Sequence, residues 1–541
     1  MRRRFLAVAA PWLVAAALSG CGGGGGDAPA TPAPSAPTGN TPQTPTGPTY
    51  TPGVYPASST YRAQCAAPRT GTNPATGLAW PDRPGSDVLE RFWLRSWVNE
   101  LYLWYDEVLD RDPALTPNTL TYFEQLKTPA TTSSGRPKDR FHFTIDTEEW
   151  RQQSQLGNVF GYGISWDLVS STPPRRVVVQ FVEPAAAAVG AGVVRGMEVR
   201  SIDGIGIDDN SPNGISTLNR GLSPAVNGQS HQFVLRDRSG VDRTITLTST
   251  TVPLTPVPVV RVLPGGVGYL VFNDHIATAE KQLVDGIRTL RDAGIVDLVL
   301  DLRYNGGGYL DIASEVAYMI GGTNVAGKVF ERTQFNAKYP STNPVIGGPL
   351  EAKPFYPTTQ GFSLVSGQPL PTLNLPRVVV LTSADTCSAS ESIINGLAGA
   401  GVQVVQVGAN TCGKPYGFYP ADNCGTTYFA IQFRGVNAQG FGEYADGFSA
   451  NRFSGDARAN LPGCAVADDL KHDLGDSAEG QLAAGLGWLR DGACTSTISG
   501  LSAPRGPRAA AATSGGEGAP PGLRVPEDPT RTNRILNPLG M

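Results

Sequence analysis

Hydrophobic residues recur along the chain with two periodicities, and their distribution predicts three folded regions. In residues 87–126, aromatic and aliphatic side chains recur every three or four positions, which indicates amphipathic helices. Between residues 156 and 252, short β-branched segments alternate with turns, which indicates a small β-rich unit. From about residue 267 to residue 486, strand-like and helix-like segments alternate, which indicates βαβ units around a sheet.

The third region contains the strongest strand signals. We expect strands at 269–272, 296–302, 378–382 and 402–407, with helices near 277–293, 312–320 and 388–397. If the last three strands are parallel, their carboxyl ends share one edge of the sheet, where open α/β sheets place their sites. A Pro-rich insert at 327–375 interrupts this pattern.

The N-terminus has the pattern of a targeting signal. Three arginines precede an apolar run at residues 5–18, which is too short to span a membrane as a mature helix. The run ends in Leu18-Ser19-Gly20-Cys21, which resembles a bacterial lipobox and implies cleavage before Cys21 and lipid attachment to its thiol. A plain secretory signal is the alternative. Because Gly22 is not acidic, the resemblance implies the outer membrane of the cell envelope.

Composition separates the ends of the chain from its middle. The Gly/Pro/Thr-rich start predicts a flexible tether and the Ala/Gly/Pro-rich end predicts a disordered tail. The expected segments are a signal peptide at 1–20, a tether at 21–60, a helical domain at 61–155, a β-rich domain at 156–255, an α/β domain at 256–498 and a tail at 499–541.

Charge and cysteine content narrow the function classes. The 43 basic residues nearly balance the 47 acidic ones, so no basic surface indicates nucleic-acid binding. Six cysteines besides Cys21 indicate disulfides in an oxidising compartment, with fifteen pairings open and Cys412–Cys424 one candidate local bridge. No CxxC pair or His-rich cluster indicates a metal site, and we expect no cofactor.

The candidate chemistry lies in the loops that follow three of the strands. A serine hydroxyl is a weak nucleophile and needs a base within hydrogen-bond reach, and a lysine can be that base where burial lowers its pKa. Ser388 begins a predicted helix, and Lys414 lies one crossover later. Glycine-rich backbone and a helix N-terminus can stabilise an oxyanion, so Gly306 or Gly307 and Ala389 are the candidate donors.

Three motifs in these loops resemble the signatures of the S41 peptidases, which are the C-terminal processing or tail-specific proteases. The motifs are residues 301–308 (Asp-Leu-Arg-Tyr-Asn-Gly-Gly-Gly), residues 388–391 (Ser-Ala-Ser-Glu) and Gly413-Lys414. The resemblance covers about residues 87–486 and implies an α/β, crotonase/ClpP-like catalytic core. It also implies a Ser–Lys dyad, with Ser388 as nucleophile and Lys414 as base.

One position departs from the family pattern. Many members have a glutamine four residues after the lysine that orients it, and this chain has Phe418 there. Other members are thought to use the glutamate of the serine motif, which maps to Glu391, on roughly the same helix face as Ser388. A helix-capping role is the alternative for Glu391. Cys387 and Cys412 lie in the two catalytic loops, so a disulfide could hold either loop.

The β-rich unit resembles a PDZ domain. The family pattern is a small-residue helix, a Gly-Asp step and a strand. This chain has the helix at 184–193 and the strand at 198–202, with Gly196-Met197 where Gly-Asp is usual. The loop and strand that bind a peptide C-terminus in PDZ domains match residues Gly161, Tyr162, Gly163 and Ile164. The N–H groups of a glycine loop can bind the terminal carboxylate, and the edge of a strand can pair with the peptide as an added strand. A structural or regulatory unit without a peptide is the alternative.

These features predict a serine endopeptidase for extended or unfolded polypeptides. The main alternative is a non-catalytic envelope lipoprotein that binds peptides or small ligands on the same scaffold. The histidines lie in no recognisable triad, and the sequence has no GxSxG or HExxH motif, which disfavours the α/β-hydrolases and the zinc proteases.

Overall fold

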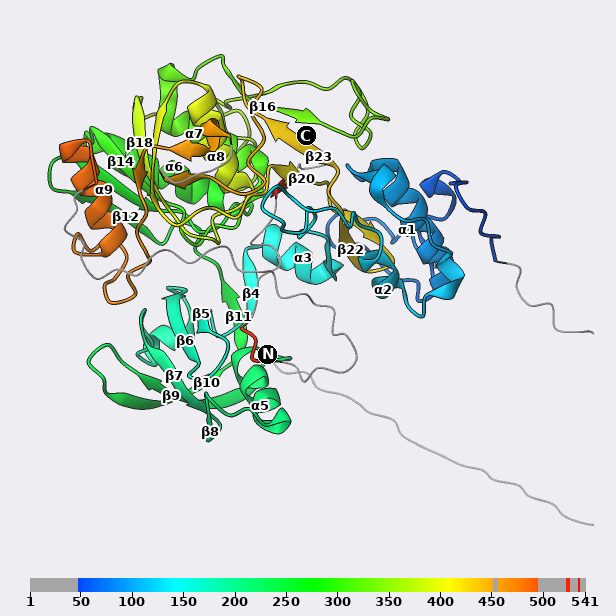
Figure 1. Ribbon diagram of the computed structural model, residues 1–541, viewed down its shortest axis with the longest axis horizontal. Helices are drawn as coiled ribbons and strands as arrows, with labels where there is room; N and C mark the ends of the chain where they lie inside the picture. Colours follow the sequence, from blue (N-terminus) through cyan, green and yellow to red (C-terminus); the bar gives the residue numbers. More distant parts are fainter. Residues whose placement is uncertain (1–46, 451–455, 495–521, 526–533, 536–541) are drawn as a thin grey trace, which may run out of the picture. The chain divides into compact units, whose positions relative to one another are not determined.

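A computed structural model of the protein describes residues 47–450, 456–494, 522–525 and 534–535 (Figure 1). Cys21 and the predicted signal peptide lie outside the described residues. Within the described residues, no helix combines the length and the apolar character needed to cross a membrane.

The largest sheet lies in the predicted catalytic region. Its order is β12-β13-β14-β18-β19-β26, with β12 antiparallel to β13 and every later neighbour parallel. The strands are β12 (Val259–Leu263), β13 (Val267–Val271), β14 (Asp297–Asp301), β18 (Arg377–Thr382), β19 (Gln403–Gly408) and β26 (Gly463–Cys464). The expected parallel arrangement is therefore confirmed, and the loops after β14, β18 and β19 leave the same edge.

Helices cover both faces of this sheet. Alternate strand residues point to opposite faces: Leu300 packs in the cluster that contains α6 (Ala279–Asp292), α7 (Leu310–Gly321) and α8 (Ala389–Gly399) residues. Val299 packs in the cluster on the other face, which contains residues of α9 (Gly480–Asp491). The continuous apolar runs of β14, β18 and β19 are explained by this burial on both faces.

A β-rich unit at residues 158–253, the predicted PDZ-like unit, has its own buried cluster. Its sheet runs β10-β9-β7-β6-β5, and β4 pairs with β11 where the chain enters and leaves the unit. The elements are β4 (Asn158–Gly161), β5 (Ile164–Ser170), β6 (Arg176–Val182), α4 (Ala187–Gly190), β7 (Glu198–Ile202), β8 (Ile205–Gly206), α5 (Pro212–Leu222), β9 (Ser230–Arg236), β10 (Asp242–Thr248) and β11 (Thr250–Pro253). Sequence analysis did not predict α5, which begins at the N-cap Ser211 with Pro212 in its first turn.

The N-terminal helices share one core with the catalytic region. Phe92 and Trp97 belong to the same buried cluster as Leu300 and Phe429. The elements are α1 (Asp87–Leu101), α2 (Thr119–Glu124), β3 (Phe143–Asp146) and α3 (Thr147–Ser154), and β3 pairs with β22 (Thr426–Phe429). These contacts explain the aromatic stripe of residues 87–126 as core packing. Short 3₁₀ turns lie at Ser58–Thr60, Tyr105–Glu107, Pro113–Leu115, Gly322–Asn324 and Ala457–Ala459.

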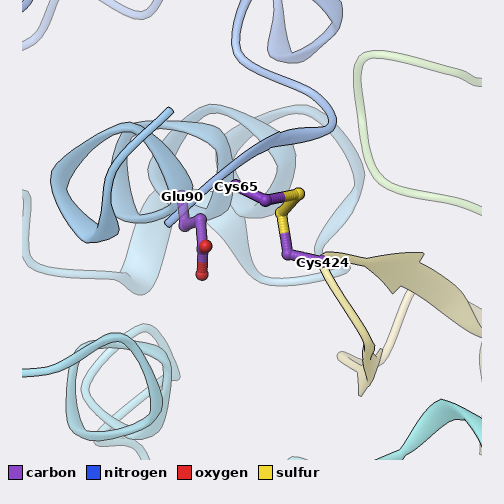
Figure 2. Close-up of side chains that lie close together, drawn as sticks. All are labelled: Cys65, Glu90 and Cys424. Atoms are coloured by element: carbon purple, nitrogen blue, oxygen red, sulfur yellow. A yellow bond between two sulfur atoms is a disulfide. The ribbon is translucent and has the colours of Figure 1, made fainter. Parts of the chain in front are cut away.

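Ordered packing begins before residue 61. The backbone N–H and the hydroxyl of Ser58 donate to the Glu100 carboxylate at 2.7 and 2.5 Å. The expected tether therefore does not extend to residue 60 in the described part. The segment is also joined to the core by the Cys65–Cys424 disulfide, beside which Glu90 lies (Figure 2).

The remaining strands are short and lie around the main sheet. They are β1 (Gln64–Cys65), β2 (Arg83–Pro84), β15 (Gly308–Tyr309), β16 (Val329–Gln334), β17 (Lys353–Pro354), β20 (Tyr416–Gly417), β21 (Ala421–Asn423), β23 (Phe433–Val436), β24 (Ser449–Ala450), β25 (Asn460–Leu461) and β27 (Arg534–Ile535). β27 and residues 522–525 belong to the tail that was expected to be disordered, and for these described residues that prediction is wrong.

Three disulfides join the six described cysteines: Cys65–Cys424, Cys387–Cys412 and Cys464–Cys494. The candidate local bridge Cys412–Cys424 is therefore wrong. Proximity in sequence favoured that pair, but the fold places Cys412 against the serine loop and Cys424 against the N-terminal segment. The expectation that a disulfide holds a catalytic loop is confirmed by Cys387–Cys412.

Candidate active site

Ser388 is the N-cap of α8 and has an unusual backbone conformation. Its φ is +62° and its ψ is −113°, a region that L-residues occupy only when the surrounding structure requires it. The residue is fully buried, and its hydroxyl makes no hydrogen bond with any described residue. A buried hydroxyl without a hydrogen-bond partner and a strained backbone both cost free energy, and such costs are typical of residues at functional sites.

Glu391 links the serine loop to the lysine loop. Its carboxylate accepts the backbone N–H groups of Ser388, Gly413 and Lys414 at 2.9, 2.9 and 2.8 Å. It also accepts the Thr411 hydroxyl at 2.5 Å. Burial raises the pKa of the Glu391 carboxyl, and these donors oppose the rise by stabilising the charged form. The carboxylate thus fixes the backbone of both loops.

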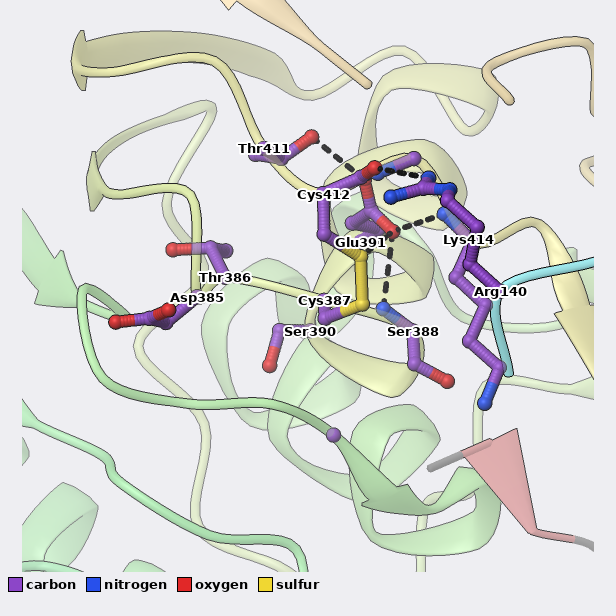
Figure 3. The surroundings of a disulfide bond; sticks show 12 residues. Arg140, Asp385, Thr386, Cys387, Ser388, Ser390, Glu391, Thr411, Cys412 and Lys414 are labelled. Carbon is purple, nitrogen blue, oxygen red and sulfur yellow. Dashed lines mark hydrogen bonds between the residues drawn. A yellow bond between two sulfur atoms is a disulfide. The ribbon is translucent and has the colours of Figure 1, made fainter. Parts of the chain in front are cut away.

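Lys414 is fully buried between two aromatic rings. Its Nζ lies 4.3 Å from the Phe418 ring centroid and 4.8 Å from that of Phe141. Phe418 packs in turn against Phe429, with centroids 5.1 Å apart. The position where many S41 members have glutamine is therefore part of an aromatic cluster around the lysine amine. Figure 3 shows the Ser388 hydroxyl and the Lys414 side chain extending to the same side of the Cys387–Cys412 disulfide.

The N-terminal region supplies residues that sequence analysis missed. Arg140 donates through Nη2 to the Cys412 carbonyl at 2.9 Å, and Phe141 contacts the lysine amine. Both residues contact the lysine loop although they are far from it in sequence, and Figure 3 shows Arg140 beside Lys414. No motif marks them, so only the fold could identify them. Thr411 was likewise not singled out, although its hydroxyl contacts Glu391.

The Cys387–Cys412 disulfide joins the residue before Ser388 to the loop that contains Lys414. The same loops are also joined by the Cys412 N–H, which donates to the Thr386 carbonyl at 3.0 Å. Cys387 and Cys412 surround Glu391, and Cys65 and Cys424 lie beside Glu90, so each group combines residue types that can ligate metals. Thiolates rather than disulfide sulfurs ligate metals, so these groups do not constitute metal sites in the oxidised protein.

The glycine-rich loop after β14 is held rigidly. The Gly307 N–H donates to Asn305 Oδ1 at 3.0 Å, so it is not available to an oxyanion in this structure. The N–H groups of Gly306 and Ala389 make no hydrogen bond with another described residue, which leaves these two of the three predicted donors. His275 Nδ1 contacts Asn305 Oδ1 at 2.9 Å, and burial lowers the pKa of His275 to about 3, so this histidine is a neutral structural residue.

The start of this loop is fixed by a buried charge network. Arg303, which is fully buried, pairs with Asp301 at 2.6 Å, with Glu479 at 2.7 Å and with Asp468 at 2.9 Å. Asp301 is the last residue of β14, and Glu479 is the N-cap of α9. Because the network joins these two elements, it fixes the direction in which the glycine loop leaves β14.

In the PDZ-like unit, the predicted carboxylate loop lies between β4 and β5. Gly161 and Gly163 have φ of +138° and +68°, and the Tyr162 ring is buried in the unit's cluster. The Gly163 carbonyl accepts the Glu183 N–H at 2.7 Å, and Ile164 begins β5 at the edge of the sheet. The loop therefore lies beside an open strand edge within the described part of the unit.

Residues 266–417 match the family model described as "Peptidase family S41", and this segment contains the three motifs. The chloroplastic carboxyl-terminal-processing peptidase 2 of Arabidopsis thaliana is 28% identical over 223 residues, which are 39% of this chain and 42% of that protein. The carboxyl-terminal-processing protease of a Picosynechococcus species is 25% identical over 287 residues, 51% of this chain and 60% of that protein. The chain spans about half the length of these curated relatives.

A solved structure from Bacteroides fragilis, of a protein assigned to the S41 proteases, is similar to this fold. It is 22% identical, with a TM-score of 0.53, and the match covers 74% of this chain and 97% of that chain. At this identity the likeness concerns the fold, and it agrees with the predicted α/β architecture.

Proposed function

We propose, on the premise that this chain contains a peptidase S41 domain, that the protein is a serine endopeptidase with Ser388 as nucleophile and Lys414 as general base. The observation that carries the proposal is the buried Ser388 hydroxyl, which has no hydrogen-bond partner in the described part of the chain. Its strained backbone is held beside the lysine loop by Glu391 and a disulfide.

The reaction proceeds through an acyl-enzyme. The neutral Lys414 amine removes the hydroxyl proton as Ser388 Oγ attacks the peptide carbonyl carbon. The negative charge that develops on the carbonyl oxygen is stabilised by the N–H groups of Gly306 and Ala389 and by the N-terminus of α8. The intermediate then expels the amine, which takes the proton from Lys414, and a water molecule hydrolyses the ester by the same steps.

Glu391 acts as a positioning residue. Its oxygens are occupied by three backbone N–H groups and one hydroxyl, so it holds the backbone of Lys414 rather than its amine. The rings of Phe141 and Phe418, and not the glutamine of many S41 members, pack around the Lys414 amine.

The substrates are extended or unfolded polypeptides, because a loop edge with free backbone donors accepts an extended chain. The PDZ-like unit takes part in recognition or regulation.

We also propose that Cys21 carries a lipid anchor in the bacterial envelope, on the outer membrane. Labelled fatty acid should enter the wild-type protein and not the Cys21→Ala variant.

The dyad is tested with Ser388→Ala and Lys414→Ala, measured on an unfolded protein substrate and with a serine-reactive fluorophosphonate. We expect loss of hydrolysis by roughly 10²–10⁴-fold for the lysine variant and more for the serine variant, with unchanged thermal unfolding. Lys281→Ala is the matched control, because Lys281 is exposed and its amine pairs with Asp285 on its own helix. Full activity in Ser388→Ala contradicts the assignment of Ser388 as the nucleophile. A wild-type protein that neither hydrolyses the substrate nor is labelled at Ser388 contradicts the peptidase function and favours a non-catalytic binding protein.

A further inference from the structure

The tail of the chain returns to the PDZ-like unit. Leu523 is 5% exposed and belongs to the buried cluster of that unit, together with Leu218 and Leu222 of α5. Val525 packs at the edge of the same cluster, whereas Arg524 between them is exposed. The alternation of buried and exposed positions is typical of an extended peptide bound in a groove.

The side chain of Asn219, on α5, binds the backbone of this segment on both sides of Leu523. Its Oδ1 accepts the Arg524 N–H at 2.8 Å, and its Nδ2 donates to the Gly522 carbonyl at 3.3 Å. A side-chain amide that pairs with a peptide backbone in this way recognises an extended chain and does not require a C-terminal carboxylate. Leu523 supplies the side-chain contact.

The same tail also adds a strand beside the candidate active site. β27 pairs in parallel with β15, Gly308 with Arg534 and Tyr309 with Ile535. β15 directly follows the loop of Gly306 and Gly307. β20, the strand that follows Lys414, also neighbours β27. In Figure 3 this strand, in red, lies on the side toward which Ser388 and Lys414 extend.

We propose that the tail is a built-in ligand that binds to α5 of the PDZ-like unit and to the strand β15 beside the candidate active site, where substrate would otherwise bind, and that it thereby inhibits the enzyme. The docking stands on the contacts above, and the inhibition rests on the proposed peptidase function. A substrate displaces the tail when it offers the same features, an extended backbone for Asn219 and an aliphatic side chain for the Leu523 pocket.

Tethering makes the tail a strong competitor despite a small contact area. A ligand that belongs to the same chain binds intramolecularly, and effective concentrations of tethered ligands can be on the order of millimolar. A free polypeptide at lower concentration competes poorly until it binds both surfaces. The tail therefore raises the apparent KM for substrate and leaves kcat unchanged.

Docking is tested in the full-length Ser388→Ala protein, so that proteolysis plays no part. Leu523→Asp places a charge in the buried apolar cluster, and Asn219→Ala removes both side-chain hydrogen bonds to the tail backbone. Arg524→Ala is the matched control, because it keeps the backbone N–H and changes only an exposed side chain. We expect amide hydrogen exchange of Gly308 and of Arg524 to rise at least tenfold in the first two variants and to stay unchanged in the control. Tyr309 is an internal reference, because its N–H donates to the His275 carbonyl and not to the tail. Unchanged exchange in both variants overturns the proposal.

Inhibition is tested with Ser388 intact, on an unfolded protein substrate. Leu523→Asp should lower the apparent KM severalfold at constant kcat, and Arg524→Ala should match the wild type. Equal KM values in Leu523→Asp and the wild type, together with raised exchange, overturn the inhibitory role. If neither protein hydrolyses substrate nor reacts with the fluorophosphonate, the peptidase function itself is wrong, and the exchange experiment alone decides the docking.

Discussion

Gly413 separates the disulfide-bonded Cys412 from Lys414, and its backbone leaves no room for a side chain. Its φ is +86°, and a Cβ there would lie 2.3 Å from the Ala445 carbonyl oxygen. The Gly413 N–H also donates to Glu391. A substitution must therefore move the segment that sets the position of the lysine.

We predict that Gly413→Ala lowers kcat by about 100-fold, because a displacement of about 1 Å at a catalytic group has that effect. Gly440→Ala is the matched control, since Gly440 also has a positive φ, +77°, with no atom within 4 Å of the added Cβ. Both variants bear the backbone cost of about 1–2 kcal/mol in unfolding free energy. Steady-state kinetics and thermal unfolding of the two variants separate the effects. A kcat for Gly413→Ala within twofold of the Gly440→Ala value contradicts the prediction.

At this scale, the sequence predicted that Glu391 lies between the serine and lysine loops, and its carboxylate contacts the backbone of both, but the sequence did not predict how each residue is held. The spacing of the motifs identified Ser388, Glu391 and Lys414 as neighbours. The use of Glu391 as an acceptor for backbone N–H groups depends on how the Gly413 loop turns, and the occupied Gly307 N–H depends on the Asn305 side chain. Short motifs do not encode these orientations, because they are set by contacts between loops.

Among the elements, the Pro-rich insert is attached to the helix layer by two buried glutamates. Glu280 on α6 accepts the backbone N–H groups of insert residues Gln360, Gly361, Ser363 and Leu364, at 2.7 to 3.0 Å. Glu315 on α7 also accepts the Gln360 N–H, at 2.8 Å. Burial, and then the neighbouring Glu280, raise the pKa of Glu315 from 4.5 to about 9, so Glu315 is protonated at neutral pH.

We predict that alkaline pH weakens the attachment of the insert to Glu280 and Glu315. A carboxyl with a raised pKa in the folded state contributes stability that is complete below pH 4.5 and is lost as the pH rises to about 9. Glu315→Gln resembles the protonated acid, so the unfolding free energy of the wild type should fall relative to this variant across that window. Urea unfolding at several pH values measures the difference. Glu148→Gln, at an exposed helix position, is the control. A pH-independent difference for Glu315→Gln contradicts the prediction.

Sequence predicted the main elements where burial gives a clear pattern. The apolar runs at 296–302, 378–382 and 402–407 became β14, β18 and β19. The helix α5 was missed because glycine and asparagine, which are weak helix formers, lie among its apolar residues. Its residues Ile215, Leu218 and Leu222 are nevertheless buried. β27 was missed because two residues of a low-complexity tail carry no period, and only their partner β15 defines them.

At the scale of the whole molecule, the long-range connections were the least predictable. Cys65 and Cys424 are 359 residues apart in sequence, and their pairing follows from packing of the N-terminal helices on β22. The same packing brings Arg140 and Phe141 to the lysine loop. Composition and spacing contain no signal for such contacts between distant segments.

Two arginines of the PDZ-like unit reach the same segment of the catalytic region, and they differ in burial. Arg195 pairs with Asp468 at 2.7 Å, with side chains 5% and 22% exposed. It also donates to the carbonyls of Gln180 and Asp469, at 2.6 and 3.2 Å. Arg238 pairs with Asp473 at 2.7 Å, with side chains 30% and 67% exposed.

We predict that Arg195→Met lowers the unfolding free energy by about 3–5 kcal/mol, because it leaves buried acceptors without donors and Asp468 with less charge compensation. Arg238→Met, a matched change on the surface, should cost about 0–1 kcal/mol. Burial raises the pKa of Asp468, but the guanidinium groups of Arg195 and Arg303 overcome this effect and hold it at about 2. A lowered carboxyl pKa contributes stability that is present above pH 3.8 and is lost toward pH 2, so the deficit of Arg195→Met should shrink over that range. Urea unfolding of both variants at neutral and acidic pH measures these differences, and equal destabilisation by the two substitutions contradicts the prediction.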